Sequence, residues 1–343
     1  MIFASSNQNK MIERAGHAIR QGELVIFPTE TVYGIGAAAH NPAAVAKLYA
    51  AKNRPQFNPL IVHCASKDAA FSLVKTTKLA QQLADAFWPG PMSIVLTSIK
   101  NSPICSLARA GLDSVALRVP ANPICQELLQ CAGMPVVAPS ANPSGRLSPT
   151  DVAHLDSALM AKCAEIIDAG KCEAGIESTI IDARNKIPVI LRPGPITHSQ
   201  IEDYLGTKCV YASSVSSPTS PTSPISPTSP TSIAPMAPIA PGQLASHYAP
   251  IAPLRMNATR KQEGEIFIGF NTPHADFNLT KTGNLEEAAA HLFDMLHLAD
   301  KQNPLAIAVA PIPNIGVGEA INERLERAAA PRNLFTNKYY PKN

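Results

Sequence analysis

Short apolar runs, each bounded by polar or turn-forming residues, recur along residues 1–205. Runs of this length rich in β-branched residues predict strands. We expect them at residues 23–27, 60–62, 94–96, 115–119, 136–137, 166–167, 179–181 and 189–191. Longer amphipathic stretches predict helices over residues 42–52, 78–87 and 124–131, and Pro55 explains why the first of them ends. Strands interspersed with helices predict an α/β or α+β domain with a sizeable sheet.

The last hundred residues have a simpler pattern. Apolar runs at residues 265–270 and 305–310 predict two strands, and each is followed by a helical pattern, at residues 285–301 and 319–329. Strands that alternate with helices in this way pair in parallel. The pattern therefore predicts a small parallel-sheet α/β domain of the Rossmann-like kind over residues 247–343.

Residues 206–246 interrupt both patterns. Their only charged side chain is Lys208, and residues 217–232 read SPTSPTSPISPTSPTS. Proline at every third position favours extended polyproline II and offers no core to bury. We therefore expect two domains, at residues 1–205 and 247–343, joined by a linker over residues 206–246. A solvated spacer is the favoured role of the repeat, and modification or docking sites are the alternative.

The balance of charges excludes several classes of protein. Residues 1–205 hold 18 Lys and Arg against 16 Asp and Glu, and residues 247–343 hold 10 of each, so neither half resembles a basic nucleic-acid-binding domain. No apolar run is long enough to span a membrane, and the N-terminus has no apolar leader, so we expect a cytoplasmic protein. Seven cysteines without a CxxC pair are predicted to be reduced core residues, and no metal site is expected.

One window of the sequence carries positive charge without any carboxylate. From Thr31 to Lys67 there is no Asp or Glu, whereas Lys47, Lys52, Arg54, His63 and Lys67 are all present. An anion such as a triphosphate would supply the missing charge, and a solvated basic turn is the equal alternative. We expect neither Lys52 nor Arg54 to be buried, because both lie at a predicted helix end.

The same window contains GIGAAA at residues 34–39, which matches the dinucleotide fingerprint only superficially. The polar residues at 28–31 interrupt the step from strand to turn, and the ribose-binding acid that should follow is absent. We therefore reject a dinucleotide-binding site.

Further candidates lie where predicted strands end. Small hydroxyl and amide side chains at residues 138–145 and at Ser148 would let a ligand approach the backbone, although a plain turn has the same composition. EST at residues 177–179 and RPG at residues 192–194 border two later strands. Arg118 lies inside an apolar strand, so it needs a carboxylate partner from the protein or from a substrate.

Taken together, these segments resemble the YrdC-like family, and specifically its long form, the threonylcarbamoyl-AMP synthases. The motifs stand in the family's order: PTETVYG (28–34), KxRP…NPLIVH (52–63), LRVP (117–120), APSANPSG (138–145), EST (177–179) and RPG (192–194). The long form also has a proline-containing linker ending in HYAP, which residues 247–250 match, and a small α/β domain after it. The SPT repeat makes the linker longer than the resemblance leads us to expect.

The resemblance implies a twisted mixed sheet with surrounding helices and a positively charged cavity. The implied reaction joins L-threonine, bicarbonate and ATP into L-threonylcarbamoyl-adenylate and pyrophosphate, for the N6-threonylcarbamoyl modification of adenosine 37 in tRNA by downstream machinery. Mg²⁺ would enter with ATP. The implied threonine or carbamate site comprises Thr31, His63, Arg118, Ser140 and Ser178. The implied ATP site comprises Lys52, Arg54, Asn58, Ser114, Ala138, Asn142, Ser148, Arg192 and Tyr248.

Bland alternatives remain for several of these residues. Arg118 and Arg192 could pair with carboxylates of the protein, and His63 could be a core histidine. For the whole chain, an RNA- or tRNA-binding module without catalysis is the main alternative, although near-neutral halves predict weak tRNA binding at most. A carbamoyl-transfer module of the hydrogenase-maturation type would need acylphosphatase and zinc-finger segments, which this sequence lacks.

Overall fold

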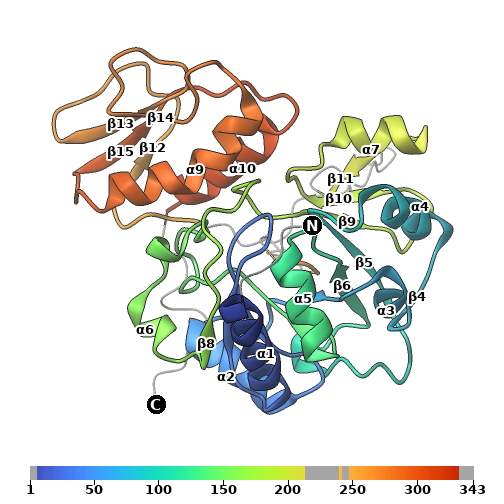
Figure 1. Cartoon of the computed structure of the whole chain (residues 1–343). Helices are drawn as coiled ribbons and strands as arrows, with labels where there is room; N and C mark the ends of the chain where they lie inside the picture. Colours follow the sequence, from blue (N-terminus) through green and yellow to red (C-terminus); the bar gives the residue numbers. More distant parts are fainter. Residues whose placement is uncertain (1–5, 213–238, 242–246, 332–343) are drawn as a thin grey trace, which may run out of the picture.

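The computed structural model describes residues 6–212, 239–241 and 247–331, and Figure 1 shows two α/β domains lying side by side. The N-terminal domain holds most of the elements. Its helices are α1 (Ser6–Arg20), α2 (Pro42–Lys52), α3 (Lys67–Phe71), α4 (Lys78–Phe87), α5 (Pro123–Ala132), α6 (Ser157–Met160) and α7 (His198–Leu205), with short 3-10 turns at Leu107–Arg109 and Val152–His154. Its strands are β1 (Val25–Phe27), β2 (Gly34–Ala38), β3 (Ile61–His63), β4 (Val74–Lys75), β5 (Met92–Ser98), β6 (Ser114–Arg118), β7 (Val136–Val137), β8 (Glu165–Ile166), β9 (Thr179–Asp182), β10 (Val189–Arg192) and β11 (Val210–Tyr211).

These strands form one mixed sheet, as the resemblance implied. The order is β11-β10-β9-β5-β6-β3-β7-β2-β1-β8, with β4 paired to β5. The central pair β3 and β6 is parallel and brings His63 opposite Arg118, whereas β7 runs antiparallel to β3. The order places residues from distant parts of the sequence side by side at the middle of the sheet.

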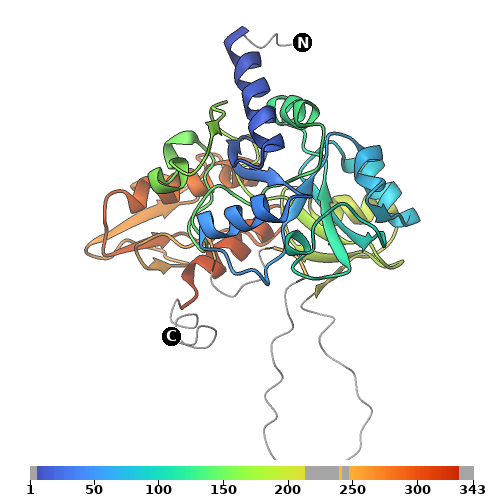
Figure 2. The ribbon, with the colours of Figure 1, turned by 90° about the horizontal axis from the view of Figure 1, so that it is seen from below.

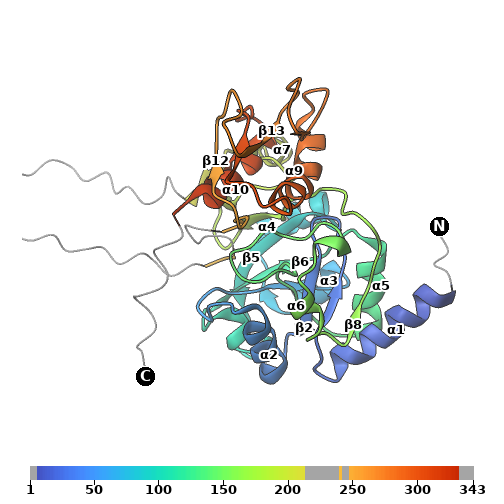
Figure 3. The same cartoon turned by 90° about the vertical axis from the view of Figure 1, so that its left-hand side faces the viewer.

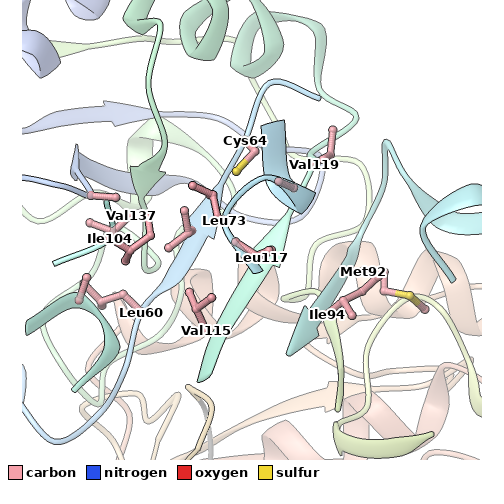
Figure 4. Packing of buried hydrophobic residues seen from close by; sticks show 14 of the residues in the cluster. Leu60, Cys64, Leu73, Met92, Ile94, Ile104, Val115, Leu117, Val119 and Val137 are labelled. Carbon is pink, nitrogen blue, oxygen red and sulfur yellow. The ribbon is translucent and has the colours of Figure 1, made fainter. Parts of the chain in front are cut away.

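The two faces of the sheet have different roles because side chains alternate along a strand. One face carries the large core, in which Val62, Leu117 and Val137 pack with α2 and α4; Figure 4 shows part of this cluster. On the other face, α1 and α5 cover the β1–β2–β7 end. The rest of that second face carries Ile61, Ala116, His63 and Arg118, and it is the side on which the candidate site lies.

Local sequence explains the helix boundaries. Asn41 caps α2 by accepting hydrogen bonds from two backbone amides, and Pro42 occupies its first turn. Helix α2 ends at Asn53, which adopts the left-handed conformation just before the basic residues of the candidate site. Helices α2 and α4 have the predicted bounds. Helix α1 was not predicted, and Figures 2 and 3 show it running along the domain edge with its N-terminal end leading away from the body.

The C-terminal domain contains the two predicted strands and two predicted helices in the predicted order, and it adds short strands at residues 254–255 and 277–278 that were not predicted. It has a four-stranded sheet in the order β12-β15-β13-β14, all of its pairs being parallel. Its elements are β12 (Leu254–Arg255), β13 (Glu265–Gly269), β14 (Phe277–Asn278), α9 (Leu285–Asp300), β15 (Ala306–Val309) and α10 (Gly318–Ala329). Helices α9 and α10 lie on the side that faces the N-terminal domain in Figure 1. No helix among the described residues is long and apolar enough to cross a membrane.

Part of the predicted linker is packed against the N-terminal domain. Strand β11 lies inside residues 206–246 and extends the sheet by pairing with β10. Ala240 joins an apolar cluster with Ile61 and Ala116 on the second face of the sheet. The SPT repeat lies outside the described residues. The GIGAAA segment forms β2, antiparallel to β1, so it is part of the sheet and no turn of a dinucleotide site.

The two domains meet at a very close approach of Gly175 to α9. A Cβ atom at Gly175 would lie 2.4 Å from the Cα atom of Ala290 and 2.6 Å from the carbonyl oxygen of Ala289. The φ angle of Gly175 is +68°, a conformation that residues with a Cβ atom rarely adopt. Glycine at this position therefore lets the backbones of the two domains touch.

Gly175→Ala should therefore weaken the docking of the C-terminal domain. We expect a loss of about 1–3 kcal/mol of unfolding free energy from overpacking, in addition to the cost of the positive φ angle. Gly170→Ala is the matched control, since Gly170 has a φ angle of +73° and open space around its Cα atom. Equal destabilisation of the two variants in urea unfolding would contradict the close approach.

A polar cluster also joins the domains. The imidazoles of His154 and His297 stack with ring centroids 4.2 Å apart. Nε2 of His154 lies 3.1 Å from Oδ1 of Asp294, whose other oxygen accepts a 2.7 Å hydrogen bond from Lys171. Nε2 of His297 donates to the carbonyl oxygen of Ser148 at 3.2 Å. Burial lowers the pKa of His154, and burial together with His154 lowers the pKa of His297 to about 3.

Acidification should loosen the domain interface through His297. Because its pKa in the folded state is below the ordinary value of about 6.5, the unfolded chain binds more protons once the pH falls below that value. We expect His297 to remove about 1.4 kcal/mol of unfolding free energy per pH unit between about pH 6.5 and its folded pKa. His297→Gln keeps a donor for Ser148 and removes the titration, so its stability should fall less steeply with acid. An unchanged slope in urea unfolding would refute this assignment.

Candidate active site

A cavity opens on the second face of the N-terminal sheet, and segments from distant parts of the chain line it. Its wall includes the ends of β3, β6, β9 and β10, the loop that follows β7, and part of the HYAP segment. The lining residues are Thr31, Val32, Arg54, Leu60, Ile61, His63, Arg118, Ala138, Pro139, Ser140, Glu177, Ser178, Arg192, Pro241, His247 and Tyr248.

The loop after α2 buries two cations beside this cavity. Lys52 is 2% exposed, and its Nζ donates to the carbonyl oxygens of Ser140 and Asn142. Arg54 is 8% exposed and donates to the carbonyl oxygens of Asn58 (3.3 Å) and Pro59 (3.0 Å). Burial lowers the pKa of both groups, and the neighbouring Arg54 adds to the effect on Lys52. Our expectation that neither would be buried was wrong, because the loop 138–145 folds over the helix end.

The rest of the carboxylate-free window behaves differently. Lys47 and Lys67 are half-exposed and pair with Glu23 and Asp85, so these two lysines match the solvated alternative. Lys52 donates to carbonyl oxygens, and Arg54 donates to carbonyl oxygens and also bonds to the side chain of Tyr49. Neither cation has a carboxylate partner among the described residues. Carbonyl dipoles offset a buried charge less completely than a carboxylate does, so this end of the cavity favours an anion.

Arg118 has an internal partner. Its Nη2 lies 2.8 Å from Oε1 of Glu30, its Nη1 donates to Oγ1 of Thr31 at 3.0 Å, and Nε donates to the carbonyl oxygen of Gly90 at 3.3 Å. Burial alone would raise the pKa of Glu30, but Arg118 and backbone hydrogen bonds together hold that pKa below its ordinary value. The protein itself therefore supplies the carboxylate that the strand arginine required, while Arg118 still lines the cavity.

Arg192 crosses from β10 to the start of β9. Its Nε and Nη2 donate to the carbonyl oxygen of Ser178 at 3.1 and 2.8 Å, and Nη2 also reaches Oγ of Ser178 at 3.1 Å. Oγ of Ser178 lies 2.8 Å from Oγ of Ser93 on β5. Burial lowers the pKa of Arg192. The alternative, in which Arg192 pairs with a carboxylate of the protein, is not observed among the described residues, where its hydrogen-bond partner is Ser178.

The HYAP segment forms the outer wall. Tyr248 is 1% exposed and has a φ angle of +59°, which is rare for a bulky side chain and is held here by packing. Its ring contacts the rings of His247 and Phe293. The amide of Ala249 donates to the carbonyl oxygen of Gly145 at 2.8 Å, which ties the segment to the loop 138–145.

Several buried polar atoms around the cavity have no hydrogen-bond partner among the described residues. They are both side-chain polar atoms of Asn58, Nδ1 of His63, Oδ1 of Asn142, Nδ1 of His247 and the hydroxyl of Tyr248. Folded proteins rarely leave such atoms unpaired, so a cluster of them beside buried cations points to a polar, anionic ligand.

His63 adds a neutral group to the wall. Burial and the nearby Arg118 lower its pKa to about 3, so its imidazole is uncharged at neutral pH. Its neighbours on β6 and β7 are Arg118 and Val136. A neutral imidazole can donate one hydrogen bond and accept another, which suits a ligand with both kinds of group.

Nine of the fourteen predicted site residues line the cavity: Thr31, Arg54, His63, Arg118, Ala138, Ser140, Ser178, Arg192 and Tyr248. Four others support the wall from behind. Lys52 donates to the carbonyl oxygen of Ser140, and Asn58 accepts from Arg54. Asn142 donates to carbonyl oxygens of its own loop, and Ser148 donates to Glu177. Ser114 is buried at the start of β6 and does not line the cavity.

Sequence reasoning gave no role to Glu30, Glu177, His247 or Arg324. The first three lie inside quoted motifs, so only their partners were missing. Arg324 has a recognisable signal: it lies on α10 among the buried residues Ala320, Ile321, Leu325 and Ala328, where an arginine needs a partner just as Arg118 did.

All seven cysteines are described and lie as free thiols. Cys64, Cys125 and Cys172 are buried, as expected of core residues, and the other four are half-buried. Among the described residues, no group of three or more His, Cys, Asp or Glu side chains is placed to hold a metal ion.

Comparison with known proteins places both domains. Residues 17–194 match the Sua5–YciO–YrdC family, which is described as "Telomere recombination", and residues 196–330 match the family "Threonylcarbamoyl-AMP synthase, C-terminal domain". The threonylcarbamoyl-AMP synthase of Bacillus subtilis is 36% identical over 347 residues, and that of Pyrococcus abyssi is 35% identical over 343 residues. The alignments cover 95% and 94% of this chain and the same share of the two relatives.

Solved structures agree with the sequence matches. A crystal structure of P. abyssi Sua5 complexed with L-threonine is 34% identical, covers 94% of both chains and has a TM-score of 0.80. A His-to-Ala and Tyr-to-Ala variant of the same protein also reaches a TM-score of 0.80 at 32% identity over 95% of each chain. Both domains, their order and their arrangement are thus shared, and the chain belongs to the threonylcarbamoyl-AMP synthase family in the form that carries the additional C-terminal domain.

Proposed function

We propose that this protein is a nucleotidyltransferase that converts L-threonine, bicarbonate and ATP into L-threonylcarbamoyl-adenylate and pyrophosphate. The observation that carries the proposal is the cavity itself. Beside it Lys52, Arg54 and Arg192 are buried, and within the described part of the chain they have no carboxylate partner and lie near polar atoms that lack hydrogen bonds. The names of the relatives and the threonine complex of P. abyssi Sua5 support the choice of substrates.

The chemistry fits a site without a nucleophilic side chain. Threonine's amine and bicarbonate combine to a carbamate with loss of water, and a carbamate oxygen then attacks the α-phosphorus of ATP. The bond from the α-phosphorus to the bridging oxygen breaks, and pyrophosphate leaves. This step needs in-line positioning and neutralisation of the phosphate charge, which buried cations supply.

The geometry suggests a division of the cavity. Arg54, Lys52 and Arg192 have uncompensated charge and would hold the phosphates, with Asn58, Ala138, Asn142 and Tyr248 around the nucleotide. Thr31, His63, Arg118, Ser140 and Ser178 would hold threonine or the carbamate. Because Glu30 already neutralises Arg118, this second half of the cavity has less positive charge and suits a zwitterionic amino acid. The carboxylate of that amino acid would face Arg118.

Mg²⁺ would be carried by the triphosphate and help to neutralise the leaving pyrophosphate. In the same proposal, the product serves a transferase that modifies adenosine 37 of tRNA, with tRNA binding here weak at most. The seven free thiols favour a reducing compartment, and we place the reaction in the cytoplasm. A purely RNA-binding role has no comparable support, since the curated relatives are named as synthases.

Release of pyrophosphate tests the proposal. Conversion of ATP to pyrophosphate should require both threonine and bicarbonate, and omission of either should reduce the rate to the background. Serine in place of threonine tests whether the amino acid is selected. Pyrophosphate release that is indifferent to threonine would contradict the proposed reaction.

A further inference from the structure

Arg324, an arginine of the C-terminal domain, reaches the wall of the cavity. Arg324 on α10 is 1% exposed and is the largest fully buried side chain among the described residues. Its Nε lies 3.1 Å from Oε2 of Glu177, and its Nη1 donates to the carbonyl oxygen of Pro193 at 2.6 Å and to Glu323 at 3.0 Å. Its Nη2 donates to the carbonyl oxygen of Glu177 at 3.2 Å. Most of these partners belong to the N-terminal domain.

Stability alone does not explain this arginine. A buried ion pair is seldom more stabilising than apolar residues of the same volume, because both charges lose their hydration. The other buried positions of α10 are apolar or glycine, so an apolar side chain at residue 324 would suit the domain interface. The contacts of Arg324 therefore call for a role at the cavity.

Glu177 gives that role. Its side chain lines the cavity, between Ser178 and the outer wall, and it is 6% exposed. Its two oxygens have one partner each: Oε1 accepts from Oγ of Ser148, and Oε2 from Arg324. Arg324 is the cation paired with Glu177 among the described residues. Without it, a carboxylate would face the space that binds a polyanion.

The backbone contacts of Arg324 lie at the same wall. The carbonyl oxygens of Glu177 and Pro193 adjoin Ser178 and Arg192, which line the cavity and bond to each other. At this point the two strands touch, since a Cβ atom on Gly194 would lie 2.3 Å from the amide nitrogen of Thr179. The guanidinium of Arg324 also lies 5.6 Å from the centre of the Tyr248 ring.

We propose that Arg324 is a positioning residue through which the C-terminal domain makes the nucleotide cavity able to bind ATP: it neutralises Glu177 at the cavity wall and holds the carbonyl oxygens next to Ser178 and Arg192. The proposal deepens the proposed function, since it assigns to the second domain a part in nucleotide binding.

ATP binding to the full chain tests this without any turnover. We expect Arg324→Met to raise the dissociation constant for ATP by about tenfold or more, because it leaves the Glu177 carboxylate facing the phosphates. The double variant Arg324→Met/Glu177→Gln should recover most of that loss, since the repelling charge is gone. Arg324→Lys keeps the positive charge and should stay within a few-fold of the unaltered protein.

Asp294→Asn is the matched control. Asp294 also pairs across the domain interface, with Lys171 and His154, but it does not line the cavity. We expect it to lower the thermal midpoint and leave ATP binding unchanged. In turnover, Arg324→Met should raise the KM for ATP more than it lowers kcat.

Two results would overturn the proposal. One is a double variant that binds ATP as weakly as Arg324→Met, and the other is an equal loss in Asp294→Asn. Should Arg324→Met fail to fold, Arg324→Lys and Glu177→Gln still test the proposal. Tenfold weaker ATP binding by Arg324→Lys would contradict the proposal that Arg324 acts by neutralising Glu177. Unaltered protein that binds ATP but releases no threonine-dependent pyrophosphate would instead contradict the proposed function and leave this test valid.

Discussion

Arg54→Ala should lose most of the affinity for ATP while its affinity for threonine stays close to that of the unaltered protein. Arg54 lines the cavity, and its guanidinium bonds to neutral groups among the described residues, namely the carbonyl oxygens of Asn58 and Pro59 and the side chain of Tyr49. Removal of one partner from a desolvated charge contact typically costs about 2–5 kcal/mol of binding free energy. Separate calorimetric titrations with ATP and with threonine measure the two affinities.

Arg109→Ala is the control for that variant. Arg109 is partly buried and donates to the carbonyl oxygens of Ile104 and Leu112, yet it does not line the cavity. It should bind both ligands normally. Equal loss of ATP affinity in the two variants would show that Arg54 acts through the fold and would contradict the assigned phosphate contact.

Arg118 needs a different experiment because it is paired internally. We expect Arg118→Ala to weaken threonine binding, but the same change leaves Glu30 buried without its cation, at a cost of about 3–5 kcal/mol of stability. The pair Arg118→Met/Glu30→Gln removes both charges and should restore stability without restoring threonine binding. Full recovery of threonine affinity in the pair would contradict a direct role of Arg118.

Tyr248→Ala should reduce the yield of the acyl-adenylate and shorten its lifetime. The ring is buried between the cavity and Phe293, and closure of such a wall excludes water from a hydrolysable product. Deletion of residues 241–250 should have the same effect. The reaction is run with labelled substrates, and the accumulation of labelled product over time measures the yield. An excess of unlabelled substrates is then added, and the decay of the labelled product measures its lifetime.

Tyr248→Phe separates the ring from the hydroxyl. The hydroxyl is buried without a hydrogen-bond partner among the described residues, so its removal should leave stability unchanged and lower ATP affinity by about 1.5–3 kcal/mol if it contacts a phosphate. The product lifetime should stay long, because the ring remains.

Removal of two SPT triplets from residues 217–232 should leave product yield nearly unchanged, since the remaining extended chain still spans about 3 Å per residue. If deletion of residues 241–250 leaves yield and lifetime unchanged, the segment is only a spacer.

The elements were predictable where their signals are local. Helix α2 has an asparagine cap, a proline in its first turn and Pro55 beyond its end, and its predicted bounds are those of the structure. The strands of the centre were found because their apolar runs are bounded by turn residues. Helix α1 was missed because it has few apolar residues. Those residues pack against α5, which lies far along the chain.

The site residues were predictable as motifs, but their partners were not. Buried Lys52 bonds to carbonyl oxygens of residues 140 and 142. The counter-ion of Arg118 is Glu30, in the loop that precedes β2. Both contacts join segments about ninety residues apart, which no local pattern encodes. Arg324 is the extreme case, since its partner Glu177 lies 147 residues away in the other domain.

Mass spectrometry of a reaction that contains ATP, L-threonine and carbon-13-labelled bicarbonate tests the central claim most directly. The account predicts a threonylcarbamoyl-adenylate that carries the label in its carbamoyl group and appears together with pyrophosphate, and it predicts that Arg54→Ala forms far less of it. An adenylate of threonine without the labelled carbon, or pyrophosphate without any such adduct, would contradict the account.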